Sequence, residues 1–434
     1  MKSVLAPAAA RRVFLALTVT RWFPVGLVVG ILTLWPLERG LSVPEALSAA
    51  SLTGITVFLL ELPTSGFADA FGRRPVYLTA AVFMVASAAV FYTATAWWQF
   101  ALAAVLTGVF RALDSGPLDA WFVDTLHSSD PDANVEGALS AQGVALGGAI
   151  AAGAVISGGL VWWHPIQSQS PLLLPGLLYL GLGVVHLVAV AFLLREPQRR
   201  AASDEAGMRR ALASVHEAPV IVRDGLSLLR RNQVLAGIVA VELFWSAGMV
   251  VFETFQPIRL AELLGSEDRA AAVTGPVASA GWGLFALGSA LSGLTSRRLG
   301  VARTAILTRI LNGVGAVVMG LVAGPVALVA AYAVTYTLHG AAGPAHSTLL
   351  HREASAHNRA TVLSMNSMVA FLAFSVTTAV AGFLAEHIST QGAMVALGAF
   401  SILGALCYLP ARGEERRRRG APHLDRQRST LASS

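Results

Sequence analysis

Charged side chains are scarce in this chain of 434 residues, at 13% of the sequence, and cysteine is represented by Cys407 alone. Soluble domains carry about 25% charged residues, so an ordinary soluble fold is excluded, and a single cysteine excludes an intramolecular disulfide. The sequence has no G-x-x-x-x-G-K-[ST] loop, no His/Cys/Asp cluster at metal-ligand spacing and no Ser/His/Asp set. We therefore expect no direct ATP drive, no metal, no cofactor and no enzymatic activity.

Apolar residues dominate instead, at 55% of the sequence, with a mean hydropathy of +0.64. A membrane-spanning helix needs roughly 20 apolar residues, and the chain has room for many. The pI of 10.1 does not indicate a nucleic-acid partner, because the arginines sit in short loops and tails. The first apolar run contains an arginine and no small-residue cleavage site, which predicts a retained helix and not a signal peptide.

The apolar runs predict an all-α integral membrane protein with twelve transmembrane helices in two six-helix bundles. We expect an N-terminal bundle at 1–194, a cytoplasmic linker at 195–232, a C-terminal bundle at 233–410 and a basic cytoplasmic tail at 411–434. The linker has an amphipathic rhythm and is interpreted as a solvated segment, with a membrane-surface role as the alternative. The predicted spans are Val13–Trp35, Leu47–Ala68, Pro75–Ala96, Phe100–Val123, Gly137–Trp163, Leu172–Leu194, Val234–Gln256, Val273–Thr295, Thr304–Ala323, Val326–Leu350, Thr361–Ala385 and Gly392–Leu409.

The basic residues indicate the orientation. Of 31 Lys and Arg, 25 fall in the N-terminus, the linker, the tail and the loops that follow even-numbered spans. The opposite side has only Arg39, Arg259 and Arg269. By the positive-inside rule both termini are cytoplasmic, and we expect a multi-pass protein of the inner (plasma) membrane.

A short charged stretch, Glu61–Arg74, joins the second and third predicted spans. Its Asp69, Gly72, Arg73 and Arg74 match the pattern G-x-L-a-D-r-x-G-R-[RK], although Ser65 stands at the first glycine and Ala70 at the first basic position. The stretch resembles the signature loop of the major facilitator superfamily, and the resemblance extends from Val13 to Leu409. The alternative is an ordinary basic turn of a membrane protein.

The resemblance implies two bundles that rock about a central site and expose it to each side in turn. It also implies that Asp69, Gly72, Arg73 and Arg74 form a latch that closes the cytoplasmic side in the outward-facing state. Asp124 ends the fourth span on the same side and is expected to meet Arg73.

The two halves carry similar landmarks. Gly300 follows the eighth span as Gly72 follows the second, 228 residues apart, and Gly343-Pro344 lies 227 residues after Gly116-Pro117. Nearly equal offsets suggest a duplication, which is the arrangement of parallel repeats in the major facilitator fold.

Ionisable residues within spans usually mark a pathway or a pair, because burying them in the bilayer costs about 2.5–3.5 kcal/mol each. Arg21 and Glu61 have similar predicted depths, so they either pair or face a wet cavity separately. Arg111 and Asp114 share a helical face and either form a local pair or, by resemblance to the motif R-x-x-q-G, line the cavity. The same resemblance implies that spans 1, 4, 7 and 10 line the central cavity.

Span 7 places Glu242 and Trp245 on one stripe, and span 10 places Tyr336 and His339 on another. Glu242 is roughly mid-membrane without a cation on its own stripe, so desolvation favours its neutral form. We predict that it carries the coupling proton, and the alternative is a hydrogen bond that only holds the bundle together.

These features predict a secondary active transporter for a small-molecule substrate. Family base rates favour proton-coupled efflux of drug-like or amphipathic compounds, and the alternative is proton-coupled uptake of an organic solute. A membrane sensor or a polytopic membrane enzyme is the alternative of another class. The expected partners are the substrate, protons and the lipid bilayer, with no nucleic acid, and the expected state is a monomer.

Overall fold

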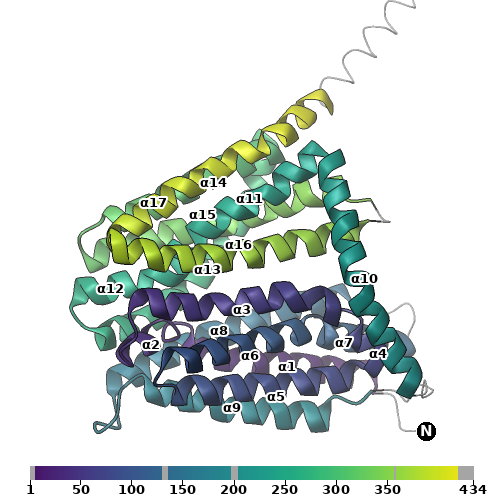
Figure 1. Ribbon diagram of the computed structural model, residues 1–434, viewed down its shortest axis with the longest axis horizontal. Helices are drawn as coiled ribbons and strands as arrows, with labels where there is room; N and C mark the ends of the chain where they lie inside the picture. Colours follow the sequence, from purple (N-terminus) through teal and green to yellow (C-terminus); the bar gives the residue numbers. More distant parts are fainter. Residues whose placement is uncertain (1–4, 130–134, 197–203, 356–357, 419–434) are drawn as a thin grey trace, which may run out of the picture.

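The computed structural model describes residues 5–129, 135–196, 204–355 and 358–418. Figure 1 shows two layers of helices, the first half of the chain below and the second half above, with α10 crossing between them on the right. We call the end that carries α10 the linker face and the opposite end, with α2 and α12, the distal face. The helices before α10 are α1 (Pro7–Val28), α2 (Leu34–Glu38), α3 (Val43–Thr64), α4 (Phe67–Phe71), α5 (Arg73–Thr93), α6 (Trp97–Asp114), α7 (Pro117–Ser129), α8 (Glu136–Trp163) and α9 (Leu173–Leu193).

The connecting helix and the second half are also helical throughout their described residues. A π-helix, η1, interrupts the first helix of the second half, and a 3-10 turn, η2, follows the last α-helix. The elements are α10 (Asp204–Arg231), α11 (Gln233–Met249), η1 (Val250–Phe255), α12 (Gln256–Leu264), α13 (Glu267–Leu299), α14 (Val301–Leu321), α15 (Pro325–Glu353), α16 (Arg359–His387), α17 (Thr390–Ile402) and η2 (Leu403–Tyr408).

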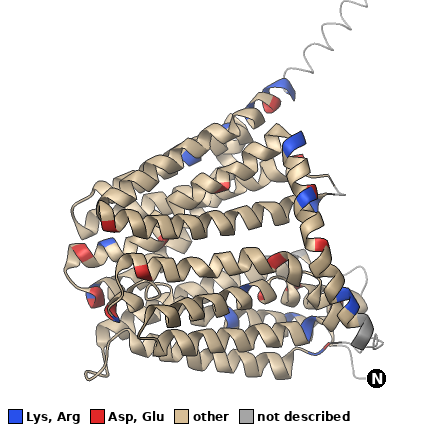
Figure 2. Ribbon diagram, viewed as in Figure 1, with Lys and Arg blue, Asp and Glu red and all other residues tan. Residues whose placement is uncertain are grey.

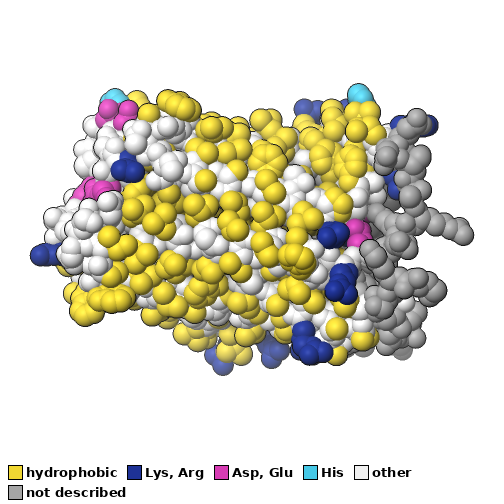
Figure 3. Space-filling model, turned by 90° about the horizontal axis from the view of Figure 1, so that it is seen from below, with side chains coloured by type: hydrophobic (Ala, Val, Ile, Leu, Met, Phe, Trp, Pro, Cys, Tyr) yellow, Lys and Arg dark blue, Asp and Glu magenta, His cyan; other side chains and the backbone are white. Residues whose placement is uncertain are grey.

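Eleven helices of the described chain are long and apolar enough to cross a membrane. The remaining predicted span corresponds to α1, whose Arg11, Arg12 and Arg21 lower its hydropathy. Figure 3 shows apolar side chains across the middle of one face and charged side chains toward its two ends. The fold is therefore that of the predicted all-helical membrane protein. In Figure 2 the Lys and Arg residues, in blue, gather toward the linker face.

The predicted and observed boundaries differ in several places. The fourth span is not one helix, because Gly116 adopts φ +92° and separates α6 from α7, whereas Pro344 lies inside the unbroken α15. The last helix does not stop at Leu409, since residues 409–418 remain helical. The linker forms one long helix, α10, that packs on α3, α4 and α16, and residues 419–434 of the predicted tail lie outside the described chain.

The two halves repeat one turn in detail. Gly72 and Gly300 have φ of +101° and +92° and start α5 and α14, a conformation that glycine adopts without steric cost. In each half a glutamate at or just beyond the end of the sixth long helix accepts hydrogen bonds from the N-terminus of the helix that follows this glycine. Glu196 accepts from the backbone N–H of Arg73 and Arg74, and Glu415 accepts from those of residues 301 and 302. A carboxylate at a helix N-terminus is stabilising, so these two glutamates fix equivalent turns.

Packing between the halves concentrates at the distal face. One buried apolar cluster joins residues of both halves, among them Leu27, Trp35, Phe252 and Ala271. Toward the linker face the large clusters separate, one built from residues 10–194 and the other from residues 235–411. Within the described chain, a small cluster of Leu62, Ala218 and Met368 joins α3, α10 and α16 there. The distal face is therefore the more firmly closed of the two.

Glycines allow the close approach of α8 and α13 within this distal closure. A Cβ on Gly158 would lie 2.6 Å from the carbonyl oxygen of Ala272 and 2.5 Å from Cδ of Pro276. Gly275 faces the carbonyl of Ala154 in the same way. Small residues let membrane helices pack backbone to backbone, so a side chain at either glycine must separate the two halves.

We therefore expect Gly158→Val to shift the protein toward a conformation that is open at the distal face. Spin labels on α8 and α13 at that face, measured by pulsed electron resonance, should report longer distances than in the unsubstituted protein. Gly159→Val is the matched control, because a Cβ on Gly159 meets no atom within 4 Å. Equal distance distributions for the two variants would contradict the expectation.

Candidate substrate cavity

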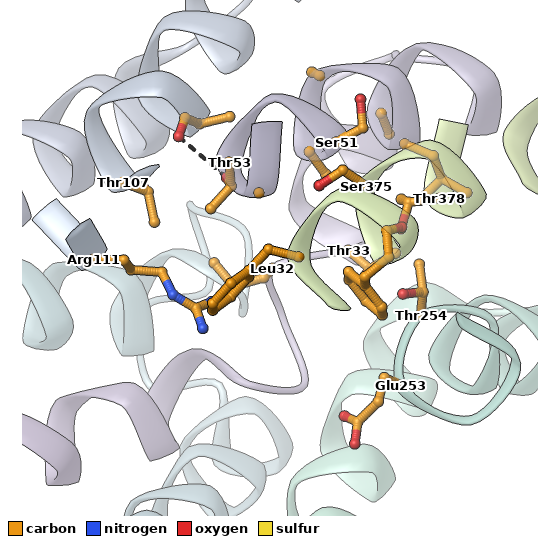
Figure 4. A pocket seen from close by; sticks show the side chains of 18 of the residues that line it. Leu32, Thr33, Ser51, Thr53, Thr107, Arg111, Glu253, Thr254, Ser375 and Thr378 are labelled. Atoms are coloured by element: carbon orange, nitrogen blue, oxygen red, sulfur yellow. Dashed lines mark hydrogen bonds between the residues drawn. The ribbon is translucent and has the colours of Figure 1, made fainter. Parts of the chain in front are cut away.

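A cavity of about 630 Å³ lies between the two halves. Its walls come from the segment after α1 and from α2, α3, α5, α6, α9, α11, η1 and α16. Hydroxyl groups are frequent on the wall, and Figure 4 labels several of them: Thr33, Ser51, Thr53, Thr107, Thr254, Ser375 and Thr378. Among the described residues no α15 side chain lines this cavity, so the expectation that span 10 does so is not met.

Arg111 lies on the cavity wall and is exposed to it. Its guanidinium carbon lies 5.3 Å from the ring centroid of Phe371, across the boundary between the halves. Within the described chain it forms no ion pair, so the predicted local pair with Asp114 is absent. The alternative from the sequence, a cavity-lining arginine, agrees with its position.

Asp114 pairs with Arg21 instead, at 3.1 Å, and this ion pair is buried inside the first half. The Arg21 guanidinium also lies over the rings of Trp22 and Phe110, at 4.7 and 4.3 Å. Neither residue lines the cavity. The pair of Arg21 with Glu61, one of the two alternatives from the sequence, is not formed in this conformation, because similar depth on two helices does not determine which faces meet.

Glu61 faces the other half of the molecule. One of its carboxylate oxygens accepts a hydrogen bond of 3.2 Å from Ser367 on α16, and the other is buried without a hydrogen-bond partner. The contact ties α3 to α16 near the linker face. Glu61 is thus a contact between halves, and does not line the cavity in this conformation.

Glu242 lies at the cavity edge within a polar network of the second half. Its Oε1 accepts a 2.9 Å hydrogen bond from Asn366 and lies 3.2 Å from Nε2 of His346. The other ring nitrogen of His346 is 2.8 Å from the Tyr408 hydroxyl. Residues from α11, α15, α16 and η2 therefore meet around the Glu242 carboxylate and the His346 imidazole. The sequence could not indicate this contact, because His346 and Asn366 lie more than 100 residues from Glu242.

Trp245 connects this network to a buried arginine. Its indole N–H donates to His339 at 3.1 Å, and the guanidinium carbon of Arg309 lies 3.9 Å from its ring centroid. Arg309 is fully buried, and none of its three side-chain nitrogens meets the geometry of a hydrogen bond to another described residue. A cation over an indole ring is stabilised by the ring quadrupole.

Glu253 is a cavity residue that the sequence analysis overlooked. It belongs to η1, is exposed to the cavity, and accepts a 2.9 Å hydrogen bond from the hydroxyl of Tyr336. Tyr336 therefore does not line the cavity itself but holds the Glu253 carboxylate through this hydrogen bond. The available signal was a second glutamate three helical turns after Glu242 on the same apolar span.

The predicted latch residues lie together at the linker face. Arg73 contacts Asp69 at 2.7 Å and Asp124 at 3.4 Å. Gly72 provides the left-handed turn beside them, and the Arg74 guanidinium donates to the carbonyl of Ala191. These contacts all join parts of the first half.

Comparison with known proteins agrees with this architecture. The profile of the Major Facilitator Superfamily matches residues 14–378 and, in a second match, residues 284–431. No curated protein sequence matches the chain at a significant level.

Solved transporter structures have the same fold. The nucleoside transporter NupG superposes with a TM-score of 0.72 at 12% identity, over 92% of this chain and 98% of that chain. A POT family transporter in complex with a thioalcohol-conjugated peptide gives 0.67 at 14% identity, over 94% and 96%. A peptide transporter POT variant gives 0.68 at 12% identity, over 94% of each chain. With its two helical halves, its central cavity and a family match over most of its length, the chain belongs to the major facilitator superfamily of secondary transporters.

Proposed function

We propose that the protein takes up a small polar organic solute together with protons. The observation that carries the proposal is the contact of Glu242 with His346 and Asn366 at the edge of the cavity. A carboxylate and an imidazole in contact can exchange a proton without changing the net charge of the pair. When the two halves move, a change of partners can then release a proton.

The cavity favours a polar solute over a purely apolar one. Its wall carries Arg111, Glu242 and Glu253 in addition to the hydroxyl groups. The solved structures of similar fold are named as a nucleoside transporter and peptide transporters, which move polar organic solutes. Both features support uptake of an organic solute better than the efflux of drug-like compounds expected from base rates.

The linker face is the proposed cytoplasmic side, because it collects most of the basic residues and basic residues remain inside. Both termini lie on this side of the inner (plasma) membrane in the proposal, and the two halves at residues 1–194 and 233–410 are the moving units. The more closed distal face corresponds to a conformation directed toward the cytoplasm.

Purified protein in liposomes loaded with the pH-sensitive dye pyranine tests the proposal. Nucleosides and dipeptides are added outside at equal pH. A coupled solute should acidify the lumen, and an outside-acid gradient should drive its accumulation. Accumulation of a solute that ignores the gradient and moves no protons would refute proton coupling.

The latch gives a separate prediction. We expect Asp69→Asn to weaken the closed state of the linker face, since Asp69 loses the charge that the positive N-terminus of a helix in the other half would stabilise in that state. Transport should fall while insertion and folding persist, because Asp69 is exposed and its ion pair contributes at most about 1 kcal/mol to stability.

Distances between labels on the two halves at the linker face provide the measurement, and they should shift toward the open state. Glu217→Gln on the exposed surface of α10 is the control. Unchanged distances with full transport in Asp69→Asn would show that the carboxylate is not part of a latch.

A further inference from the structure

Arg111 and Glu253 place a basic and an acidic side chain in the same cavity, one from each half of the molecule. Arg111 belongs to α6 and Glu253 to η1, and both are exposed to the cavity. In Figure 4 they lie on opposite sides of the pocket, and both side chains extend into the space between them. They do not form a salt bridge with each other within 4 Å in the described chain.

The two residues also have similar depth. Arg111 lies about fourteen residues from the start of α6, and Glu253 about eleven residues from the end of α12, both counted from the distal face. At about 1.5 Å per residue these positions are roughly 21 and 16 Å deep. Because the two side chains lie at similar depths, one solute in the cavity can contact both of them.

Among the residues that the structure describes, neither Arg111 nor Glu253 forms an ion pair. Asp114, the carboxylate nearest to Arg111 along its helix, is engaged by Arg21, and the observed neighbour of Arg111 is the ring of Phe371. Glu253 has the neutral phenol of Tyr336 as its partner. An unpaired charge inside a membrane protein is costly and usually marks a substrate pathway.

The backbone at Glu253 is a second, independent observation. Residues 250–255 form a π-helix within an otherwise α-helical span. Such segments are rare and occur frequently at functional sites. Glu253 and Thr254 of this segment both line the cavity.

We propose that the cavity binds an amphoteric solute, with its anionic group at Arg111 and its ammonium group at Glu253. This assignment rests on the proposed uptake of a polar solute and names its charge class. Because the two residues belong to different halves, the bound solute bridges them and neutralises both charges. A solute of this kind favours closure of the halves around it, whereas a singly charged solute leaves one buried charge unpaired.

Binding to purified protein in detergent, measured by calorimetry without any pH gradient, tests the assignment. The probes are ω-amino carboxylates from glycine to 6-aminohexanoate, together with alanyl-alanine, so that several charge separations are sampled. Each is compared with its N-acetyl form, which lacks the ammonium, and with its amide, which lacks the carboxylate. For the best amphoteric probe, either modification should weaken binding roughly 10- to 100-fold.

Variants assign the ends of the solute. Arg111→Gln should weaken the amphoteric probe and remove the penalty for amidation, while the penalty for acetylation stays. Glu253→Gln should do the reverse. Arg269→Gln and Glu386→Gln, exposed residues of α13 and α16 near the distal face, are matched controls and should bind like the unsubstituted protein.

Three results would overturn the assignment: no amphoteric probe binds, the modified probes bind equally well, or both variants lose all probes alike. Equal binding of all forms would mean that Arg111 and Glu253 neutralise each other when the cavity closes. The calorimetric assay requires no proton gradient, so it can support the amphoteric solute even if the pyranine assay detects no proton coupling. Conversely, the pyranine assay can detect proton coupling for a solute that is not amphoteric.

Discussion

Glu242→Gln is expected to reduce solute accumulation driven by a pH gradient to the level of protein-free liposomes, while solute binding is retained. The carboxylate lies 3.2 Å from His346 and accepts a hydrogen bond from Asn366. Glutamine keeps the shape and a hydrogen-bonding oxygen, so the network persists. It removes the titratable carboxyl group, and with it the proposed exchange of a proton with the imidazole.

Counterflow separates the coupling role from a structural one. Exchange of labelled for unlabelled solute across the membrane needs no net proton movement, so Glu242→Gln should retain it. Glu386→Gln at the exposed end of α16 is the matched control and should accumulate solute normally. Normal pH-driven accumulation by Glu242→Gln would mean that the residue only holds the helices together, and Glu61 would become the next carboxylate to test.

Asp114→Asn is expected to destabilise the first half by about 3–5 kcal/mol, the usual loss when one partner of a buried ion pair is removed. The side chains of Arg21 and Asp114 are 6% and 16% exposed. Without the carboxylate the guanidinium keeps its aromatic contacts with Trp22 and Phe110 but loses its counter-ion in the membrane. The midpoint of thermal unfolding in detergent should fall clearly.

The double variant Arg21→Met, Asp114→Leu distinguishes a buried pair from a general packing defect. Removing both charges leaves no unpaired ion, and replacing buried pairs by apolar side chains is often neutral. The double variant should therefore be more stable than Asp114→Asn alone. Thermal midpoints of Asp114→Asn and the unsubstituted protein that agree within error would show that the pair contributes little.

The sequence by itself determined the class of the protein. Long apolar runs have one stable outcome in a bilayer, since backbone groups there must bond within their own helix. The chain therefore had to form spanning helices, and the motif at Asp69–Arg74 identified the family. The glycines at 72 and 300 could also be assigned to equivalent turns, because a tight reversal requires a residue that tolerates positive φ.

Only the tertiary structure decided which membrane charges meet. Helical periodicity gives the face and approximate depth of Arg21, Glu61 and Asp114, but not the rotation of one helix against another. Arg21 consequently pairs with Asp114 across α1 and α6, and Glu61 contacts Ser367 more than 300 residues away. Helix breaks have the same origin: Gly116-Pro117 interrupts its span while Gly343-Pro344 does not. Local sequence permits either conformation, and the surrounding packing selects one.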